Sequence, residues 1–302
     1  NLSVVAYFDH NATTHLSPAA RSAMTRALTE MGAEPGNPSS IHEGGRRARD
    51  RVERARAELS AHMGGAAQDR ADGASATLVF TSGGTEANVL GILGAARKAA
   101  ERGRPRRVLT SVVEHPSVLA ACDALAPEGW HVARAGVDAD GRLDWAGIAR
   151  ELERGVALVS VALANHELGN VYDLARLCTL AHATGALVHS DAVQALGKVP
   201  IDVSALGVDF LSLSAHKVGG PMGVGALWMR RGTDFSPPVP AGHQEKGFRP
   251  GTENVPGIVG LGLACELAER LLASEPVRQR ELRELLFALL AKGCPDVQPN
   301  SP

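Results

Sequence analysis

The sequence predicts an α/β fold with a mostly parallel central sheet. Short apolar runs typical of buried strands alternate with segments of helical periodicity along most of the chain. Polar or glycine-rich groups follow five of these runs, and α/β sheets bind ligands at the carboxyl ends of their strands. The 302 residues, 44% of them hydrophobic, suffice for a large core with or without a smaller second domain.

The charge balance gives no sign of a nucleic-acid or membrane partner. The chain has 31 basic and 33 acidic residues, a formal net charge of -2. The basic run over residues 46–56 is interleaved with acidic residues, which is typical of a solvated helix face. No apolar stretch is long enough to span a bilayer. Residues 1–7 lack the features of a signal peptide, so we expect none.

The cysteines indicate a reducing compartment, and we expect a cytoplasmic protein. Cys122, Cys178, Cys265 and Cys294 are far apart, and no C-x-x-C pair occurs. This spacing favours free thiols over a disulfide framework or a zinc site, and we expect no metal site.

The N-terminal part shows loop signals and two helices. Residues 8–14 are polar and turn-prone, and Ser17 can cap a helix that has Pro18 at its first position. Residues 36–40 indicate a loop. A helix over residues 43–63 is predicted by apolar residues at helical spacing, namely Ala48, Val52, Ala55 and Leu59.

A strand over residues 77–81 runs into Ser82-Gly83-Gly84-Thr85 and then into a helix. A strand, a small-residue turn and a helix N-terminus together can bind phosphate, because free backbone N–H groups and the helix dipole face the anion. The turn could equally be an ordinary connection.

Two later strands also end in polar groups. The strand over residues 108–113 ends at Glu114-His115-Pro116, where His115 is either structural or functional. After a strand candidate over 130–135 and a helix capped by Asp144, the strand over 157–162 leads to Asn165 and His166.

A helix over residues 174–184 precedes the strand 186–190, which ends at Asp191, with Gln194 three residues later. An aspartate that closes an apolar strand is costly to bury without a cationic partner. Asp191 is therefore either a helix cap or one member of a buried charged pair.

The strand over residues 208–213 leads to Ser214, His216 and Lys217, followed by a glycine-rich turn and a strand over 224–229. Lysines are rarely buried unless they are paired, and a partly desolvated lysine can form a Schiff base with an aldehyde. A proline-rich loop and a polar, glycine-rich segment over 241–252 come next, then helices over 256–272 and 275–290.

These groups together match what pyridoxal phosphate requires. The phosphate needs a helix N-terminus, the aldehyde needs a lysine, and the ring nitrogen needs a carboxylate that keeps it protonated. Lys217 supplies the amine, Asp191 the carboxylate, His115 a flat stacking group and Gln194 a donor to the ring hydroxyl. We therefore predict pyridoxal 5'-phosphate as the cofactor.

The motifs also resemble those of a known family. Tyr-Phe-Asp-His-Asn-Ala-Thr-Thr, Gly-Asn-Pro-Ser-Ser, Thr-Ser-Gly-Gly-Thr-Glu-Ala-Asn, Glu-His-Pro-Ser-Val, Asn-His-Glu-Leu-Gly, Ser-Asp-Ala-Val-Gln, Ser-Ala-His-Lys and Arg-Pro-Gly-Thr-Glu-Asn occur in this order. From residue 7 to about residue 275 the chain resembles cysteine desulfurases of the NifS/IscS group, which have the class V aminotransferase fold.

The resemblance implies a type I pyridoxal-phosphate-dependent transferase fold, similar to aspartate aminotransferase. It divides the chain into an N-terminal segment (1–15), a cofactor-binding large domain (16–255), and a connecting helix with the start of a small domain (256–302). The family's sulfur-accepting cysteine loop and its arginine for the substrate carboxylate would follow residue 302. The chain is then expected to be a fragment or a degenerate homologue.

The resemblance also implies residue roles. Lys217 would hold the cofactor and His115 would stack on its ring and move protons, so these two are the expected catalytic residues. Asp191 would pair with the ring nitrogen and Gln194 with the ring oxygen. The other expected cofactor contacts are Gly84, Thr85, Asn165, His166, Ser214, His216 and, across a homodimer, Thr252. His166 stands where the family usually has asparagine.

The implied reaction removes sulfur from L-cysteine, gives L-alanine, and passes the sulfur to iron–sulfur scaffold or tRNA-thiolation proteins. Two alternatives remain at this point. One is another class V activity, such as a transaminase or a cysteine/selenocysteine lyase. The other is a non-catalytic homologue that acts as a dimer partner.

Overall fold

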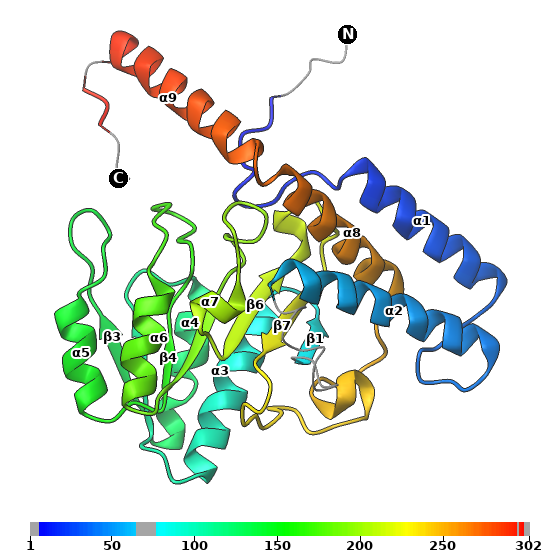
Figure 1. Ribbon diagram of the computed structural model, residues 1–302, viewed down its shortest axis with the longest axis horizontal. Helices are drawn as coiled ribbons and strands as arrows, with labels where there is room; N and C mark the ends of the chain where they lie inside the picture. The colour runs from blue at the N-terminus through cyan, green and yellow to red at the C-terminus, as the bar shows by residue number, and fades with distance from the viewer. Residues whose placement is uncertain (1–5, 65–76, 295, 299–302) are drawn as a thin grey trace.

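The computed structural model describes residues 6–64, 77–294 and 296–298. Within these ranges a seven-stranded sheet has the order β1-β7-β6-β5-β4-β2-β3 (Figure 1). Its strands are β1 (Thr77–Thr81), β2 (Arg107–Ser111), β3 (His131–Ala135), β4 (Leu158–Ser160), β5 (Leu187–Asp191), β6 (Phe210–Ser214) and β7 (Gly225–Met229). Only the pairs that involve β7 are antiparallel. The predicted mostly parallel α/β fold is confirmed.

The helices follow the predicted order. They are α1 (Pro18–Ala33), α2 (Glu43–His62), α3 (Gly84–Glu101), α4 (Pro116–Asp123), α5 (Trp145–Glu153), α6 (Leu174–Ala183), α7 (Val203–Leu206), α8 (Val255–Leu271) and α9 (Glu275–Gly293), with 3-10 turns at Ala126–Glu128, Ala215–Lys217 and Gln244–Gly247. Ser17 caps α1 by accepting a 3.1 Å hydrogen bond from the Ala20 N–H, and Asp144 caps α5 through the Gly147 N–H at 2.9 Å. Both predicted caps are therefore confirmed.

Each face of the sheet is covered by its own hydrophobic core. Helices α3 and α4 cover one face, and α2, α5, α6 and α8 contribute to the core on the other. Side chains alternate between the cores along a strand: in β7, Trp228 packs into one core and Leu227 into the other. Burial on both faces explains why these strands read as continuous apolar runs in the sequence.

The topology brings the five polar groups to one edge. Strands β2, β4, β5 and β6 are parallel, so their carboxyl ends point the same way. Strand β1 also ends there, because Thr81 and Ser214 both pair with Gly225 of the antiparallel β7. The residues after each of these strands therefore face the same region, as the sequence predicts.

The C-terminal helices differ in how they pack. Helix α8 packs against α1 and α2, whereas α9 extends away from the sheet, and none of its described side chains is buried (Figure 1). The predicted division into segments 1–15, 16–255 and 256–302 stays a prediction, and residues 1–5, 295 and 299–302 lie outside the described residues. No helix of the described ranges combines the length and apolarity needed to cross a membrane.

Candidate functional site

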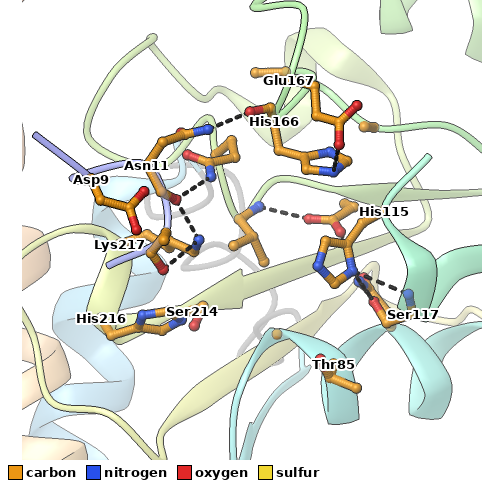
Figure 2. A pocket seen from close by; sticks show the side chains of 18 residues that line it. Asp9, Asn11, Thr85, His115, Ser117, His166, Glu167, Ser214, His216 and Lys217 are labelled. Atoms are coloured by element: carbon orange, nitrogen blue, oxygen red, sulfur yellow. Dashed lines mark hydrogen bonds and ion pairs between the residues drawn. The ribbon is translucent and has the colours of Figure 1, made fainter. Parts of the chain in front are cut away.

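A cavity of about 490 Å³ lies at the carboxyl edge of the sheet (Figure 2). Nine of the eleven residues predicted to form the site line it, and they come from five different segments of the chain. They are Gly84, Thr85, His115, His166, Asp191, Gln194, Ser214, His216 and Lys217. The structure therefore brings together residues that are up to 133 positions apart, from 84 to 217.

Lys217 lies in the turn that follows β6, and its amine faces the N-terminal segment. Its Nζ donates hydrogen bonds to the backbone carbonyls of Asn11 at 2.6 Å and Ala12 at 2.9 Å (Figure 2). Burial lowers the pKa of Lys217, although the carboxylates of Asp191 and Asp9 oppose this shift. A lowered pKa makes the unprotonated, nucleophilic amine more abundant at neutral pH.

Asp191 is the last residue of β5 and is only 5% exposed. Its carboxylate accepts hydrogen bonds from Asn88 Nδ2 at 2.7 Å and from the Val193 N–H at 2.9 Å, and both donors are neutral. Burial raises the pKa of Asp191. A buried carboxylate with only neutral donors gains most from a cationic N–H, which a protonated pyridine ring can supply.

His115 caps helix α4 and faces the cavity. Its Nδ1 accepts a hydrogen bond from the Ser117 N–H at 3.1 Å, so the neutral ring carries its proton on Nε2. Burial lowers the pKa of His115, which favours the neutral ring. The His166 ring lies edge-on, 5.2 Å from it between centroids. His115 can therefore present an N–H donor to a group in the cavity.

The turn at the start of α3 has the features of a phosphate site. A Cβ at Gly84 would lie 2.5 Å from Val193 Cγ2, so only glycine leaves this space open. The hydroxyl of Ser214 is buried without a hydrogen-bond partner, and it faces the same cavity. Thr85 lies in the first turn of α3, where free N–H groups favour an anion. These groups fit the phosphate of pyridoxal phosphate.

Two predicted contacts lie outside the cavity lining. Asn165 uses its amide in its own loop: Nδ2 donates to the Val113 carbonyl at 2.7 Å, and Oδ1 accepts from the N–H groups of Glu167 and Leu168. Thr252 is exposed and lies beside a different, smaller depression. The structure of a single chain does not test whether Asn165 or Thr252 contacts a cofactor, so both contacts stay predictions.

Several lining residues were missed by reasoning from the sequence. Asp9, Asn11 and Ala12 belong to a segment that was interpreted only as a turn, although its motif is part of the family resemblance. Asn88 lies four residues after Gly84, on the same face of α3, so helical spacing could have identified it. Ser117 and Glu167 also line the cavity.

Glu114 connects the ends of β2 and β4 behind the cavity. It is 4% exposed, and its carboxyl group accepts hydrogen bonds from Ser111 Oγ at 2.5 Å and from the Ala162 N–H at 2.9 Å. Burial, with a contribution from the nearby Asp191 carboxylate, raises the pKa of Glu114 to about 8. Glu114 is therefore mostly neutral at pH values below this.

The segment that contains Thr252 is held by two ion pairs. Glu245 accepts a two-pronged pair from Arg56, at 2.8 and 3.0 Å, and a 2.8 Å hydrogen bond from the Phe80 N–H. Arg249 pairs with Glu86 of α3 at 2.8 Å. Glu245 has φ of 47°, a left-handed conformation that is uncommon for a residue with a side chain. The two pairs fix this segment to α2 and α3.

A family model for class-V aminotransferases matches residues 6–297. A cysteine desulfurase from Cereibacter sphaeroides is 50% identical over 263 residues, which is 87% of this chain and 65% of that protein. The NifS cysteine desulfurase of Azotobacter vinelandii is 42% identical over 282 residues, or 93% of this chain and 67% of that one. The chain thus spans slightly less than two thirds of the first of these relatives.

Solved structures of similar proteins share the fold of this chain. A NifS-like protein from Rickettsia africae ESF-5 superposes with a TM-score of 0.82 at 31% identity, over 94% of this chain and 74% of that one. The structure described as SspA in complex with cysteine has a TM-score of 0.75 at 32% identity, over 87% of this chain and 72% of that one. The resemblance stated from the motifs is therefore confirmed, and so is the predicted fold.

Proposed function

The chain belongs to the class-V aminotransferase family, and from that premise we propose that it forms the cofactor site of a pyridoxal-phosphate-dependent cysteine desulfurase. The central observation is that a buried aspartate with only neutral donors and a partly buried lysine line the same cavity. Asp191 suits a protonated ring nitrogen, and Lys217 suits an aldehyde. A purely structural role leaves both groups unexplained.

Pyridoxal phosphate, the cofactor of this family, fits the residues present. Lys217 would hold its aldehyde carbon, Asp191 its ring nitrogen, and Gly84, Thr85 and Ser214 its phosphate. When bound, it serves as an electron sink for bonds broken at the α-carbon of an amino acid.

The chain's own residues would hold and move the protons of the reaction. Asp191, as a buried anion, would keep the ring nitrogen that faces it protonated. Lys217 is placed to accept a proton once its amine is released, because its lowered pKa favours the neutral base. His115 carries its proton on Nε2 and can donate a hydrogen bond from it to a group in the cavity.

We propose L-cysteine as the substrate, with L-alanine as the carbon product and sulfur passed to a thiol. The name of the Cereibacter relative and the bound cysteine of the SspA structure support this choice. Burial raises the pKa values of Cys122, Cys178 and Cys265 to about 12, so these thiols are poor sulfur acceptors. Cys294 is exposed beyond α9 and does not line the cavity.

The proposal includes a homodimer and sulfur-acceptor proteins. Thr252 would reach the phosphate site of the partner subunit, which agrees with its exposure and with the two ion pairs that hold its segment. Iron–sulfur scaffold or tRNA-thiolation proteins would receive the sulfur. Four free cysteines support a reducing compartment such as the cytoplasm.

The first test is the visible absorbance of the lysine-bound cofactor. The wild-type chain should show this band after loading with pyridoxal phosphate, and Lys217→Ala should lose it while keeping its circular dichroism spectrum. With L-cysteine and an added thiol, alanine and sulfide are the expected products. Pyruvate formation would favour a lyase, and a bound cofactor without turnover would favour a non-catalytic partner.

A mixed dimer tests the role of Thr252. Lys217→Ala and Thr252→Ala chains are produced together with different affinity tags, and the doubly tagged dimer is isolated. If Thr252 acts across the interface, one of the two sites has an intact lysine and an intact threonine, so half of the wild-type cofactor binding returns. If Thr252 acts within its own chain, the mixed dimer binds no better than the average of its parents.

A further inference from the structure

A second lysine lies directly behind the cavity. Lys198 comes four residues after Gln194, and residues 192–199 form consecutive turns in which the N–H groups of Leu196 and Val199 bond to carbonyls four residues earlier. This geometry places the side chains of positions 194 and 198 next to each other. Gly197 makes the bend possible, because its φ is 71° and a Cβ there would lie 2.7 Å from Ala268 Cβ.

Lys198 and Gln194 are in direct contact. The Lys198 amine donates a hydrogen bond to Gln194 Oε1, and Gln194 itself is only 7% exposed. Burial, together with the nearby Lys217 ammonium, lowers the pKa of Lys198 to about 8. Below this pH Lys198 is an ammonium, which donates hydrogen bonds and accepts none.

The contact fixes which end of the Gln194 amide faces the cavity. The two ends of a glutamine amide have nearly the same shape, so hydrogen-bond partners decide its orientation. An ammonium attracts the oxygen and leaves the NH₂ group on the opposite side. There Gln194 Nε2 donates to the Asn11 carbonyl at 2.9 Å, the carbonyl that also accepts from Lys217.

We propose that Lys198 is a positioning residue, which holds Gln194 so that its N–H group faces the ring oxygen of pyridoxal phosphate. The proposal rests on the proposed function. The Asn11 contact lies on the cavity side, where a bound ring would compete for the same donor. The Lys198 contact lies on the far side and persists when the cavity is filled. The ammonium also polarises the amide and strengthens its N–H as a donor.

A direct electrostatic effect is the alternative to positioning, because the Lys198 ammonium repels the positive charge of Lys217. The two effects differ in their dependence on Gln194. A positioning effect passes through the glutamine side chain and disappears when that side chain is removed. A direct electrostatic effect on Lys217 remains, so a double-mutant cycle separates the two.

The experiment measures the dissociation constant of pyridoxal phosphate by equilibrium dialysis of the loaded protein at about pH 7, where Lys198 is charged. Lys198→Met keeps the apolar stem and removes the donor, whereas Lys198→Arg keeps a donor. We expect Lys198→Met to weaken binding about tenfold, or about 1.4 kcal/mol, and to shift the cofactor's absorbance maximum. Lys198→Arg should restore most of the affinity. In a Gln194→Ala background Lys198→Met should change neither quantity.

Lys98→Met is the matched control, because Lys98 pairs with Glu101 on the surface of α3, outside the cavity. Wild-type affinity in Lys198→Met, or an equal loss with and without Gln194, would overturn the positioning role while leaving the proposed function intact. A wild-type chain without the cofactor band would overturn the proposed function, and the role of Lys198 with it.

Discussion

Asn88, one turn into α3, donates a 2.7 Å hydrogen bond from Nδ2 to Oδ2 of Asp191, the last residue of β5. The same amide nitrogen also donates to Ser117 Oγ at 3.0 Å, so one side chain links α3, β5 and α4. Asp191 and Asn88 are both almost fully buried, so this hydrogen bond is largely shielded from bulk water.

Asn88→Ala should weaken binding of pyridoxal phosphate about tenfold, because Asp191 loses the donor that orients and stabilises its anion. Equilibrium dialysis of the loaded variant measures the change. Asn170→Ala is the control, since Asn170 bonds to the Asp140 carbonyl and does not line the cavity. Equal affinities for the two variants would contradict the assigned role of Asn88.

Gly84→Ala should also weaken cofactor binding, because the added Cβ would lie 2.5 Å from Val193 Cγ2 and narrow the phosphate turn. Trimming the opposing side chain in a Gly84→Ala, Val193→Ala double variant should recover part of the loss. A competition assay with inorganic phosphate localises the effect to the phosphate end. Unchanged phosphate binding in Gly84→Ala would place the phosphate elsewhere.

The rate of cofactor loading should rise with pH, because only the unprotonated Lys217 amine attacks an aldehyde. The Asp9 carboxylate raises the pKa of Lys217, so Asp9→Asn should move the midpoint of this profile to lower pH. Because Asp9 is exposed, the shift should shrink at high salt. Stopped-flow absorbance measures the profile, and a shift to higher pH would refute the electrostatic link.

Glu114 should make the protein less stable as the pH rises. Folding raises its pKa from 4.5 to about 8, so the folded state binds more protons than the unfolded state in this window. The contribution to stability is full below about pH 4.5 and is lost as the pH rises to about 8.

Glu114→Gln should flatten this dependence, because an amide can keep the acceptor for the Ala162 N–H and donate to Ser111 Oγ. Urea unfolding at several pH values measures the slope. Glu101→Gln, at an exposed position of α3, is the control and should keep the wild-type slope. An unchanged slope in Glu114→Gln would show that the group is ionised throughout.

Arg56→Met should lower the free energy of unfolding by about 3–5 kcal/mol, because it leaves the buried Glu245 carboxylate without its charge partner. Arg51→Met removes a pair with the exposed Glu30 and should cost at most about 1 kcal/mol. Urea unfolding of both variants tests the difference. Similar losses would mean that Glu245 is hydrated or neutral in the folded protein.

Much of the fold could be predicted because the core strands are buried on both faces and most helix N-caps use a local side chain. The strands at 77–81 and 208–213 could be predicted from their apolar sequence without knowledge of tertiary contacts. The antiparallel direction of β7 could not be predicted, since an apolar run that follows a glycine-rich turn does not reveal its direction.

The candidate site was predictable where residues lie at or just beyond the end of a strand, as for Asp191 and Lys217. It was not predictable where the contact depends on a distant segment. The Asn11 carbonyl meets Lys217 across 206 positions, and a backbone oxygen leaves no pattern in a sequence. Thr252 is the opposite case: the family resemblance identified it from the sequence, but its proposed role depends on a second chain.

In the proposed function, helix α3 carries two parts of the site that act on opposite ends of one small molecule. Gly84 opens the phosphate turn, and Asn88 supports Asp191 one turn later, about 6 Å further along the helix axis. Because an α-helix resists stretching, this spacing is a fixed length rather than an adjustable one. The pocket should therefore select its cofactor by the distance between phosphate and ring nitrogen, and discriminate against analogues with a longer or shorter phosphate arm.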